Sequence, residues 1–297
     1  MSQPDTILCI GSVLWDIIGR SGSHMRAGSD VPGRITRLPG GVAMNIAMTL
    51  RRYGLHPEVL TAIGKDAEGR DLLAACHGLG VGTKYAYLSE DLPTDRYMAV
   101  EGANGLIAAI ADAHSLEAAG AKILRPLADG RLGSADQPYQ GLIALDGNLT
   151  ETLLAEIAQS PLFVKSDLRI APASPGKAER LRPLLEVPHA TFYVNLEEAG
   201  LLCHRNFSSA RDAAEALFRI GAARALVTDG GNEAAMASPE GVFRASPPEV
   251  LVTRVTGAGD TFMAAHIALE TEGIEAQGAL SRALEAAAAY VSGDTGT

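Results

Sequence analysis

The sequence is poor in cysteine, in aromatic residues and in basic charge. Among its 297 residues are three cysteines and one tryptophan, and 35 acidic against 25 basic residues leave a formal net charge of −10 at pH 7. Three scattered cysteines argue against a disulfide framework and suit reduced thiols in a cytoplasmic protein. The shortage of basic residues argues against a nucleic-acid partner, because binding along a phosphate backbone needs clustered lysine and arginine.

Long apolar runs are missing as well. No stretch reaches the roughly 18 apolar residues of a membrane span. The first residues, MSQPDTILCI, lack the basic region and the cleavage signal of a secretory peptide. We therefore expect a cytoplasmic protein with no membrane partner.

What the sequence does contain is a regular alternation of strand and helix patterns. The apolar or β-branched runs that predict buried strands fall at 6–11, 58–64, 141–146, 190–195 and 224–230. The helical patterns, several of them ended by a glycine, fall at 42–53, 69–79, 150–159, 176–186, 208–220, 260–272 and 278–291. Such alternation predicts an α/β fold with a mainly parallel central sheet covered on both faces, in one domain over 1–297.

Two stretches break the alternation. Residues 12–38 are rich in glycine, serine and arginine, and residues 95–112 read as two strands joined around Asn104 and Gly105, a common tight-turn pair. Together they predict a small sheet that projects from the main one. Beside the carboxyl ends of parallel strands, such a sheet would lie as a lid over a ligand.

The stretch VTRVTGAGDTFMAAHIALE, residues 252–270, places Gly257, Ala258 and Gly259 before Asp260 at a predicted helix start. Helix N-termini attract anions, and small residues let an anion approach the backbone. Asp260 could simply cap the helix. A dinucleotide-binding turn fits poorly, because Phe262 stands where the third glycine belongs. A Walker-type phosphate loop does not occur in the sequence.

A third interpretation gives this stretch a chemical role. The backbone amides of 257–259 would hold a phosphoryl group while Asp260 accepts the proton of an attacking hydroxyl. Phosphoryl transfer needs little from a protein beyond placement, charge neutralisation and a base. The sequence therefore allows a kinase-like function without a phosphate-binding lysine.

Five stretches resemble the signatures of one family. TGAGDTFMA is very similar to the C-terminal signature of the ribokinase-like (PfkB) sugar and nucleoside kinases. The other four, in family order along the chain, are LPGGVAMNIAMTLRRYG, TAIGKDAEG, VNLEEAGLL and LVTDGGNEAAM. The resemblance implies a ribokinase-like three-layer fold with a small β lid. It also implies phosphoryl transfer from ATP, with Mg²⁺, to a small sugar or nucleoside, and it allows a homodimer formed through the lid.

The resemblance further implies roles for single residues on the substrate side. Asp16 and Asn45 would bind sugar hydroxyls, and Gly40 and Gly41 would allow close approach of the backbone. From the residues alone, Asp16 could equally be a turn residue, and Asn45 could belong to a solvated helix face.

On the nucleotide side, the resemblance places Asn195 and Glu198 near Mg²⁺ and its waters, and Thr228 and Gly230 beside ATP. The spacing of Asn195 and Glu198 is also that of a helix capping box, and spacing alone does not decide between the two roles.

Three positions depart from the family pattern. Val194 replaces the usual proline, and Asp229 replaces a hydrophobic residue, although an acid beside phosphates would repel them unless it faces away or reaches the metal. Arg254 stands where many relatives carry an aspartate. It could contact phosphate or be an exposed strand-end charge, and the missing acid puts a monovalent-cation site in doubt.

Within the family, ALDGNL, VTGAGD and IAPASPGKAERLRPLL resemble the pseudouridine kinases of bacteria and plants. The implied reaction is phosphorylation of the 5′-hydroxyl of pseudouridine. Tyr97, Asp112 or His114 of the lid would then face the base, although lone polar residues of such a sheet are more often solvated. The alternatives are a PfkB kinase for ribose, fructose, a sugar acid or a conventional nucleoside, a catalytically silent binding protein, and a nicotinamide dehydrogenase.

Overall fold

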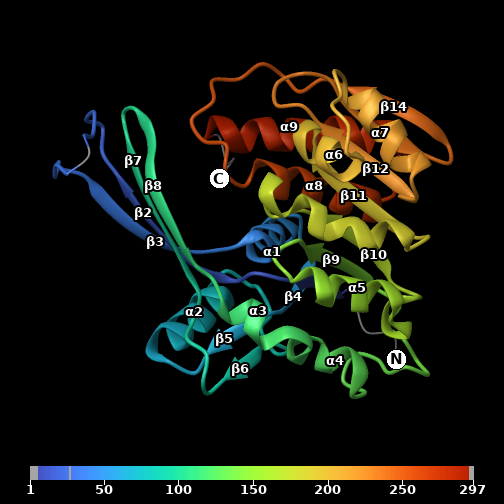
Figure 1. Ribbon diagram of the computed structural model, residues 1–297, viewed down its shortest axis with the longest axis horizontal. Helices are drawn as coiled ribbons and strands as arrows, with labels where there is room; N and C mark the ends of the chain where they lie inside the picture. The colour runs from blue at the N-terminus through green and yellow to red at the C-terminus, as the bar shows by residue number, and fades with distance from the viewer. Residues whose placement is uncertain (1–5, 27, 294–297) are drawn as a thin grey trace.

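The computed structural model of the protein describes residues 6–26 and 28–293. Its centre is an eight-stranded sheet with the order β14-β13-β12-β11-β10-β9-β1-β4 (Figure 1). The strands are β1 (Thr6–Ile10), β4 (His56–Leu60), β9 (Leu142–Asp146), β10 (Asp167–Ala171), β11 (Ala190–Asn195), β12 (Arg224–Thr228), β13 (Ala234–Ser238) and β14 (Gly241–Ala245). All neighbours from β12 to β4 are parallel, and β13 and β14 pair antiparallel. The carboxyl ends of the parallel strands therefore share one edge, which we call the carboxyl edge.

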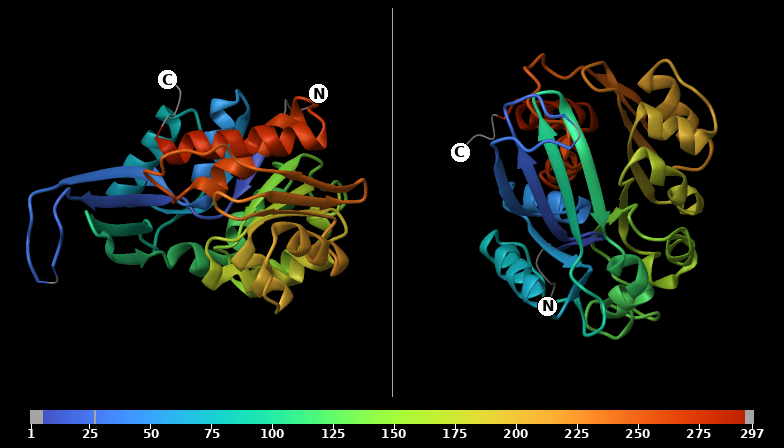
Figure 2. Two further views of the ribbon diagram at one scale, coloured as in Figure 1. Left: turned by 90° about the horizontal axis from the view of Figure 1, so that it is seen from above. Right: turned by 60° about the vertical axis from the view of Figure 1, so that its left-hand side comes forward.

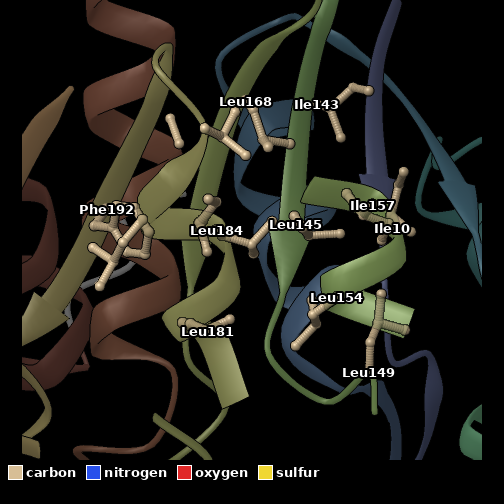
Figure 3. Close-up of a cluster of buried hydrophobic side chains, with 14 of the residues drawn as sticks. Ile10, Ile143, Leu145, Leu149, Leu154, Ile157, Leu168, Leu181, Leu184 and Phe192 are labelled. Atoms are coloured by element: carbon tan, nitrogen blue, oxygen red, sulfur yellow. The ribbon is translucent and has the colours of Figure 1, made fainter. Parts of the chain in front are cut away.

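The central sheet separates two hydrophobic cores, because successive side chains of a strand point to opposite faces. In β1, Leu8 and Ile10 lie in the first core, while Ile7 and Cys9 lie in the second. Figure 3 shows part of the first core, where Ile10 lies among leucine and isoleucine side chains from the sheet and its covering helices. The three layers of helix, sheet and helix agree with the predicted α/β class.

Different helices cover the two cores. Those against the first core are α3 (Ser115–Ala119), α4 (Arg125–Ala128), α5 (Glu151–Gln159), α6 (Leu196–Cys203), α7 (Ala210–Arg219) and the 3₁₀ helix η3 (Pro175–Glu186). Those against the second core are α1 (Val42–Arg52), α2 (Ala67–Gly78), α8 (Ala258–Thr271) and α9 (Ala276–Ser292). Within the described residues, no helix combines the length and the apolar character needed to cross a bilayer.

A second sheet, which we call the lid sheet, projects from the main body (Figures 1 and 2). Its order is β3-β2-β7-β8. The strands are β2 (Leu14–Arg20), β3 (Arg34–Gly40), β7 (Arg96–Gly102) and β8 (Gly105–Asp112). The β7–β8 turn consists of Ala103 and Asn104, one residue earlier than predicted, and Gly105 opens β8 with φ 89. The small β sheet expected from the two irregular stretches is thus present.

The predicted strands are confirmed, but three further strands of the main sheet were not predicted from the sequence. β10 reads DLRIA, with Arg169 in its middle, and β13 reads AAMAS, so neither shows a strong β-branched run. β14, at the sheet edge, has only alternate side chains partly covered. The predicted strand at 58–64 is two strands, β4 and β5 (Ala62–Gly64), of which β5 pairs with β6 (Tyr87–Ser89).

The predicted helix at 176–186 is a 3₁₀ helix rather than an α-helix. Pro175 begins it and Pro183 lies inside it. Proline has no backbone N–H and clashes with the preceding turn of an α-helix, so this segment cannot form a regular α-helical ladder.

Candidate active site

Asn45 and Asp260, far apart in the sequence, meet at the carboxyl edge. Each lies in the first turn of its helix, Asn45 in α1 and Asp260 in α8. The side-chain amide of Asn45 donates a hydrogen bond to the Asp260 carboxylate, with 2.8 Å between Nδ2 and Oδ2. Asn45 therefore does not belong to a solvated helix face. Asp260 is not the cap of α8 either, because the N-cap residue is Gly257.

The Asp260 carboxyl has an unusually high proton affinity. Its side chain keeps some contact with solvent, but the carboxyl group is surrounded by protein, and this burial raises its pKa to about 7. The hydrogen bond from Asn45 opposes the rise, while the nearby acids Asp146, Glu198 and Asp16 add to it. A carboxylate with a pKa near neutral pH is well suited to accept a proton.

The two glycines before Asp260 have different surroundings. Gly257 has φ 87, and a Cβ there would lie 2.5 Å from the Tyr290 hydroxyl oxygen, so the protein itself requires a glycine. A Cβ at Gly259 would meet no heavy atom within 4 Å. The N–H of Ala258 is already used, since it donates to the Val255 carbonyl at 3.1 Å. The open space at Gly259 thus lies beside first-turn N–H groups that lack a partner within the helix.

Arg254 packs against α9 instead of ending a strand. Its guanidinium lies over the ring of Tyr290 at 3.8 Å, and its Nε donates to the Tyr290 carbonyl at 2.8 Å. The Tyr290 hydroxyl in turn donates to the Thr256 carbonyl at 2.9 Å. These contacts fasten the stretch before Gly257 to the end of α9, so the sequence interpretation of an exposed strand-end charge does not hold.

Asp16 reaches the carboxyl edge from β2 of the lid sheet. A Cβ at Gly40 would lie 1.9 Å from its carboxylate, so glycine leaves the space that Asp16 fills. Gly41 has φ 94, and a Cβ there would lie 2.5 Å from the Ser12 carbonyl oxygen. Burial raises the pKa of Asp16 to about 6. Both glycines therefore have structural reasons, independent of any ligand.

Asp146, at the end of β9, is a site residue that the sequence interpretation missed. It is fully buried, and burial raises its pKa. Its Oδ2 accepts hydrogen bonds from the Ser12 N–H at 2.7 Å, the Ser12 hydroxyl at 2.8 Å and the Ala43 N–H at 3.3 Å. Asp146 therefore ties the loop after β1 to the start of α1, the helix that carries Asn45. An acid at the carboxyl end of a predicted strand was the available signal.

This site lies in a chain with clear relatives. The sequence matches the pfkB family of carbohydrate kinases over residues 4–296. The chain belongs to this family. It is therefore a kinase that transfers a phosphoryl group to an alcohol.

Individual relatives of this PfkB-family kinase support the assignment. A pseudouridine kinase from Escherichia coli (strain K12) is 30% identical over 273 residues, which cover 89% of this chain and 83% of that protein. A carbohydrate kinase from Agrobacterium tumefaciens is 26% identical, with a TM-score of 0.80, and the match covers 96% of this chain and 90% of that one. A ribokinase from Arabidopsis thaliana, complexed with ribose and ATP, is 19% identical, with a TM-score of 0.74 over 97% and 92% of the two chains. The ribokinase-like fold predicted from the sequence is confirmed.

Asn195 and Thr228 lie side by side at the carboxyl edge, because they pair across the ends of β11 and β12. Asn195 and Glu198 form a complete capping box for α6. The Asn195 N–H donates to Glu198 at 2.8 Å, and the Glu198 N–H donates to the Asn195 side chain at 2.9 Å. The capping interpretation is therefore correct.

Asp229 and Gly230 directly follow β12, in the region where the family resemblance places the nucleotide. Gly230 has φ 56, and nothing would contact a Cβ there, so the space beside it is open. The Asp229 side chain accepts a hydrogen bond from the Asn232 amide at 3.0 Å. Asp229 is thereby engaged within its own turn.

The carboxyl edge offers oxygen ligands of the kind that Mg²⁺ prefers, but they do not form a complete metal site by themselves. Among the residues that the structure describes, no three His, Cys, Asp or Glu side chains form a group that could hold a metal ion. Mg²⁺ usually keeps several waters and takes only one or two carboxylates besides phosphate oxygens. Glu198 fits such a role, because its carboxyl is buried, no cationic side chain in the described part of the chain pairs with it, and burial raises its pKa to about 7.

Proposed function

We propose that this kinase phosphorylates the 5′-hydroxyl of pseudouridine with ATP, giving pseudouridine 5′-phosphate and ADP. The observation that carries the proposal is the hydrogen-bonded pair of Asn45 and Asp260 at the mouth of α8, in a chain that is 30% identical to a pseudouridine kinase over most of its length. The pair supplies a base beside a position where a sugar hydroxyl can be held.

In the proposed reaction, Asp260 acts as the general base. The 5′ oxygen attacks the γ-phosphorus of ATP, a new P–O bond forms, and the bond from that phosphorus to the bridging oxygen breaks, so ADP leaves with the electron pair. The hydroxyl proton moves to the Asp260 carboxylate. Asn45 keeps this carboxylate oriented by the hydrogen bond to Oδ2.

Charge that develops on the transferred group would meet the start of α8. The first-turn amides, with open space beside Gly259, are suited to bind phosphoryl oxygens. Gly257 contributes its backbone conformation, and Ala258 contributes a side chain small enough to leave the approach free. Thr228 and Gly230 would lie beside the nucleotide.

The substrate side would use the lid sheet and α1. Asp16 would accept hydrogen bonds from ribose hydroxyls, and Asn45 would bind the sugar with the donor or acceptor atoms that Asp260 leaves free. Mg²⁺, when bound with ATP, neutralises phosphate charge, and Glu198, through its carboxylate, and Asn195 are the residues of this chain that would lie near it.

A panel of acceptors tests the proposed function. Pseudouridine, uridine, ribose and fructose are each incubated with ATP and Mg²⁺, and the products are identified by phosphorus NMR and chromatography. We expect a 5′-monophosphate from pseudouridine at the highest kcat/KM. Turnover of ribose or another sugar, with none of pseudouridine, would overturn the substrate and leave a different PfkB kinase.

We also propose that two copies pair through their lid sheets. β8 is an exposed edge strand, and Leu106, Ile107 and Ile110 are among its exposed side chains. An unpaired apolar edge is a surface on which a second strand can add. Light scattering tests this, and a monomer at all accessible concentrations would contradict it.

A further inference from the structure

Asp16 marks the face of the lid sheet that belongs to the candidate active site. Residues directly opposite each other on neighbouring strands present their side chains to the same face. Asp16 pairs with Leu38 of β3 and with Tyr97 of β7. Tyr97 is therefore the direct neighbour of Asp16 on this face, on the side of β2 away from Gly40 and β3.

The electrostatic surroundings of Tyr97 agree with this placement. Burial raises the pKa of its hydroxyl, and the charges of Asp16 and Glu101 raise it further. Glu101 lies on the same face, since it is four residues along β7 and paired with Arg20. Among the residues described by the structure, none forms a hydrogen bond with the Tyr97 hydroxyl. The hydroxyl is thus available to a ligand held by Asp16.

On the β8 side of Tyr97, the lid sheet carries small side chains. Its partner on β8 is Ala111, and the next pair on the same face is Ala99 with Ala109. Ala99 is buried, but Ala109 and Ala111 of β8 are exposed, so their methyl side chains leave space where a planar ring can lie beside the aromatic ring of Tyr97. A sugar alone, held at Asp16, would not extend over it.

The other lid residues named from the sequence face elsewhere. Asp112 pairs with Arg96 on the opposite face, and their side chains approach to 3.6 Å. Arg96 also lies 3.7 Å from Glu68 of α2, on the outer side of the lid sheet. His114 is exposed and comes after β8, at the start of α3. Of the three candidates, only Tyr97 shares the face of Asp16.

We infer that Tyr97 contacts the base of the nucleoside and determines its selectivity, an inference that rests on the proposed function. Its ring packs against the edge of the base, and its hydroxyl oxygen accepts a hydrogen bond from a ring N–H. Pseudouridine has a ring N–H at the position that forms the glycosidic bond in uridine. A tyrosine oxygen can therefore favour pseudouridine over uridine through one hydrogen bond.

Two substitutions at Tyr97 and one control test this. Tyr97→Phe removes only the hydroxyl, and Tyr97→Ala removes the ring. Met98→Ala is the matched control, because Met98 is the next residue of β7, 42% exposed, and points to the opposite face. KM and kcat are measured with pseudouridine and uridine, and ribose is measured as a competitive inhibitor. Melting temperatures report whether each variant folds.

We expect Tyr97→Phe to raise the KM for pseudouridine about tenfold, the effect of one lost hydrogen bond, with little change for uridine. Tyr97→Ala should raise both KM values further, by about 100-fold for pseudouridine. Neither variant should alter kcat or the inhibition constant of ribose, and Met98→Ala should alter nothing.

The outcomes separate the inference from the function on which it rests. An unchanged pseudouridine KM in Tyr97→Ala would overturn the inference, and so would an equal loss of ribose binding, because Tyr97 would then act on the sugar or on the lid sheet as a whole. If the unsubstituted chain does not phosphorylate pseudouridine, the proposed function fails first.

Discussion

The helix α8 carries an acid at each end, and the two acids have opposite environments. Asp260, in the first turn, has a pKa raised to about 7, and its hydrogen-bond partner is the neutral amide of Asn45. Glu270, in the last turn, is also largely buried, and burial alone would raise its pKa. Arg169 and Arg224 instead bring it down to about 2.

The difference separates the end of α8 that anchors the helix to the sheet from the end that carries the candidate catalytic acid. At the Glu270 end, charges from β10 and β12 are paired within the protein, so this end is anchored to the sheet. At the Asp260 end, the charged side chains that raise its pKa are acids, and among the described residues no cationic side chain forms an ion pair with Asp260. An uncompensated, buried acid is a cost to stability that a substrate proton and a bound cation can relieve.

The largest expected effect is the loss of activity in Asp260→Asn. The amide keeps the size of the side chain and can still accept the hydrogen bond from Asn45, but it cannot take a proton. We expect kcat to fall by about 10³-fold, within the range for a general base. Asp136→Asn, at an exposed acid outside the site, is the control. An Asp260→Asn variant with normal turnover would show that the base lies elsewhere.

The opposite end of α8 should respond in stability rather than in chemistry. Glu270→Gln removes an anionic partner from both Arg224 and Arg169, while Arg169 keeps its other partner, Asp167, so the free energy of unfolding should fall by about 2 kcal/mol. Glu215→Gln is the control, because Glu215 bridges Arg211 and Arg219 on the surface and should matter by less than about 1 kcal/mol. Urea titration measures both. Equal stability of the two variants would contradict the role given to the Glu270 end.

The hydrogen bond from Asn45 should set the pH dependence. Asp260 must be unprotonated to act as a base, so kcat/KM should rise with pH through about 7. Asn45 favours the charged carboxylate, and Asn45→Ala should therefore move this rise to higher pH. The loss of one hydrogen bond to a charged group predicts about a tenfold lower kcat/KM at pH 7. If the rise of kcat/KM in Asn45→Ala moved to lower pH instead, the role given to the Asn45 hydrogen bond would be wrong.

The smallest effect concerns the stability of Asp260→Asn itself. The pKa of Asp260 is higher in the folded chain than its ordinary value of 3.8. Below that value both states hold the proton, and as the pH rises toward about 7 the unfolded chain releases it first, so wild-type stability declines. The variant should gain about 1 kcal/mol over wild type at pH 8 and less at pH 4. Thermal unfolding at both pH values measures the gain in stability. A smaller gain at pH 8 than at pH 4 would contradict this prediction.

The sequence predicts the local parts of this site better than the long-range ones. Gly257, Gly259 and Asp260 are neighbours in one helix start, so their pattern alone allowed an anion site with an adjacent carboxylate, beside the plainer interpretation of a helix cap. The partner of Asp260 could not be derived in this way. Asn45 precedes it by 215 positions, and helical periodicity placed Asn45 on a polar face that looked solvated.

Asp146 and the ion cluster of α8 show the same limit. Arg169 interrupts β10 and conceals that strand, and only the folded sheet shows that its charge is balanced by Glu270. Asp146 ends a predicted strand, but it accepts hydrogen bonds from Ser12 and Ala43, across the carboxyl edge. Local propensity describes elements, whereas burial and pairing of charges depend on how the elements meet.

A crystal structure of the kinase with pseudouridine and a non-hydrolysable ATP analogue would test the proposed active site directly. We expect the 5′ oxygen within about 3 Å of the Asp260 carboxylate, the reach of a general base. We also expect the γ-phosphate against the first turn of α8 beside Gly259. A 5′ oxygen out of contact with Asp260, or phosphates bound away from this turn, would contradict this proposal.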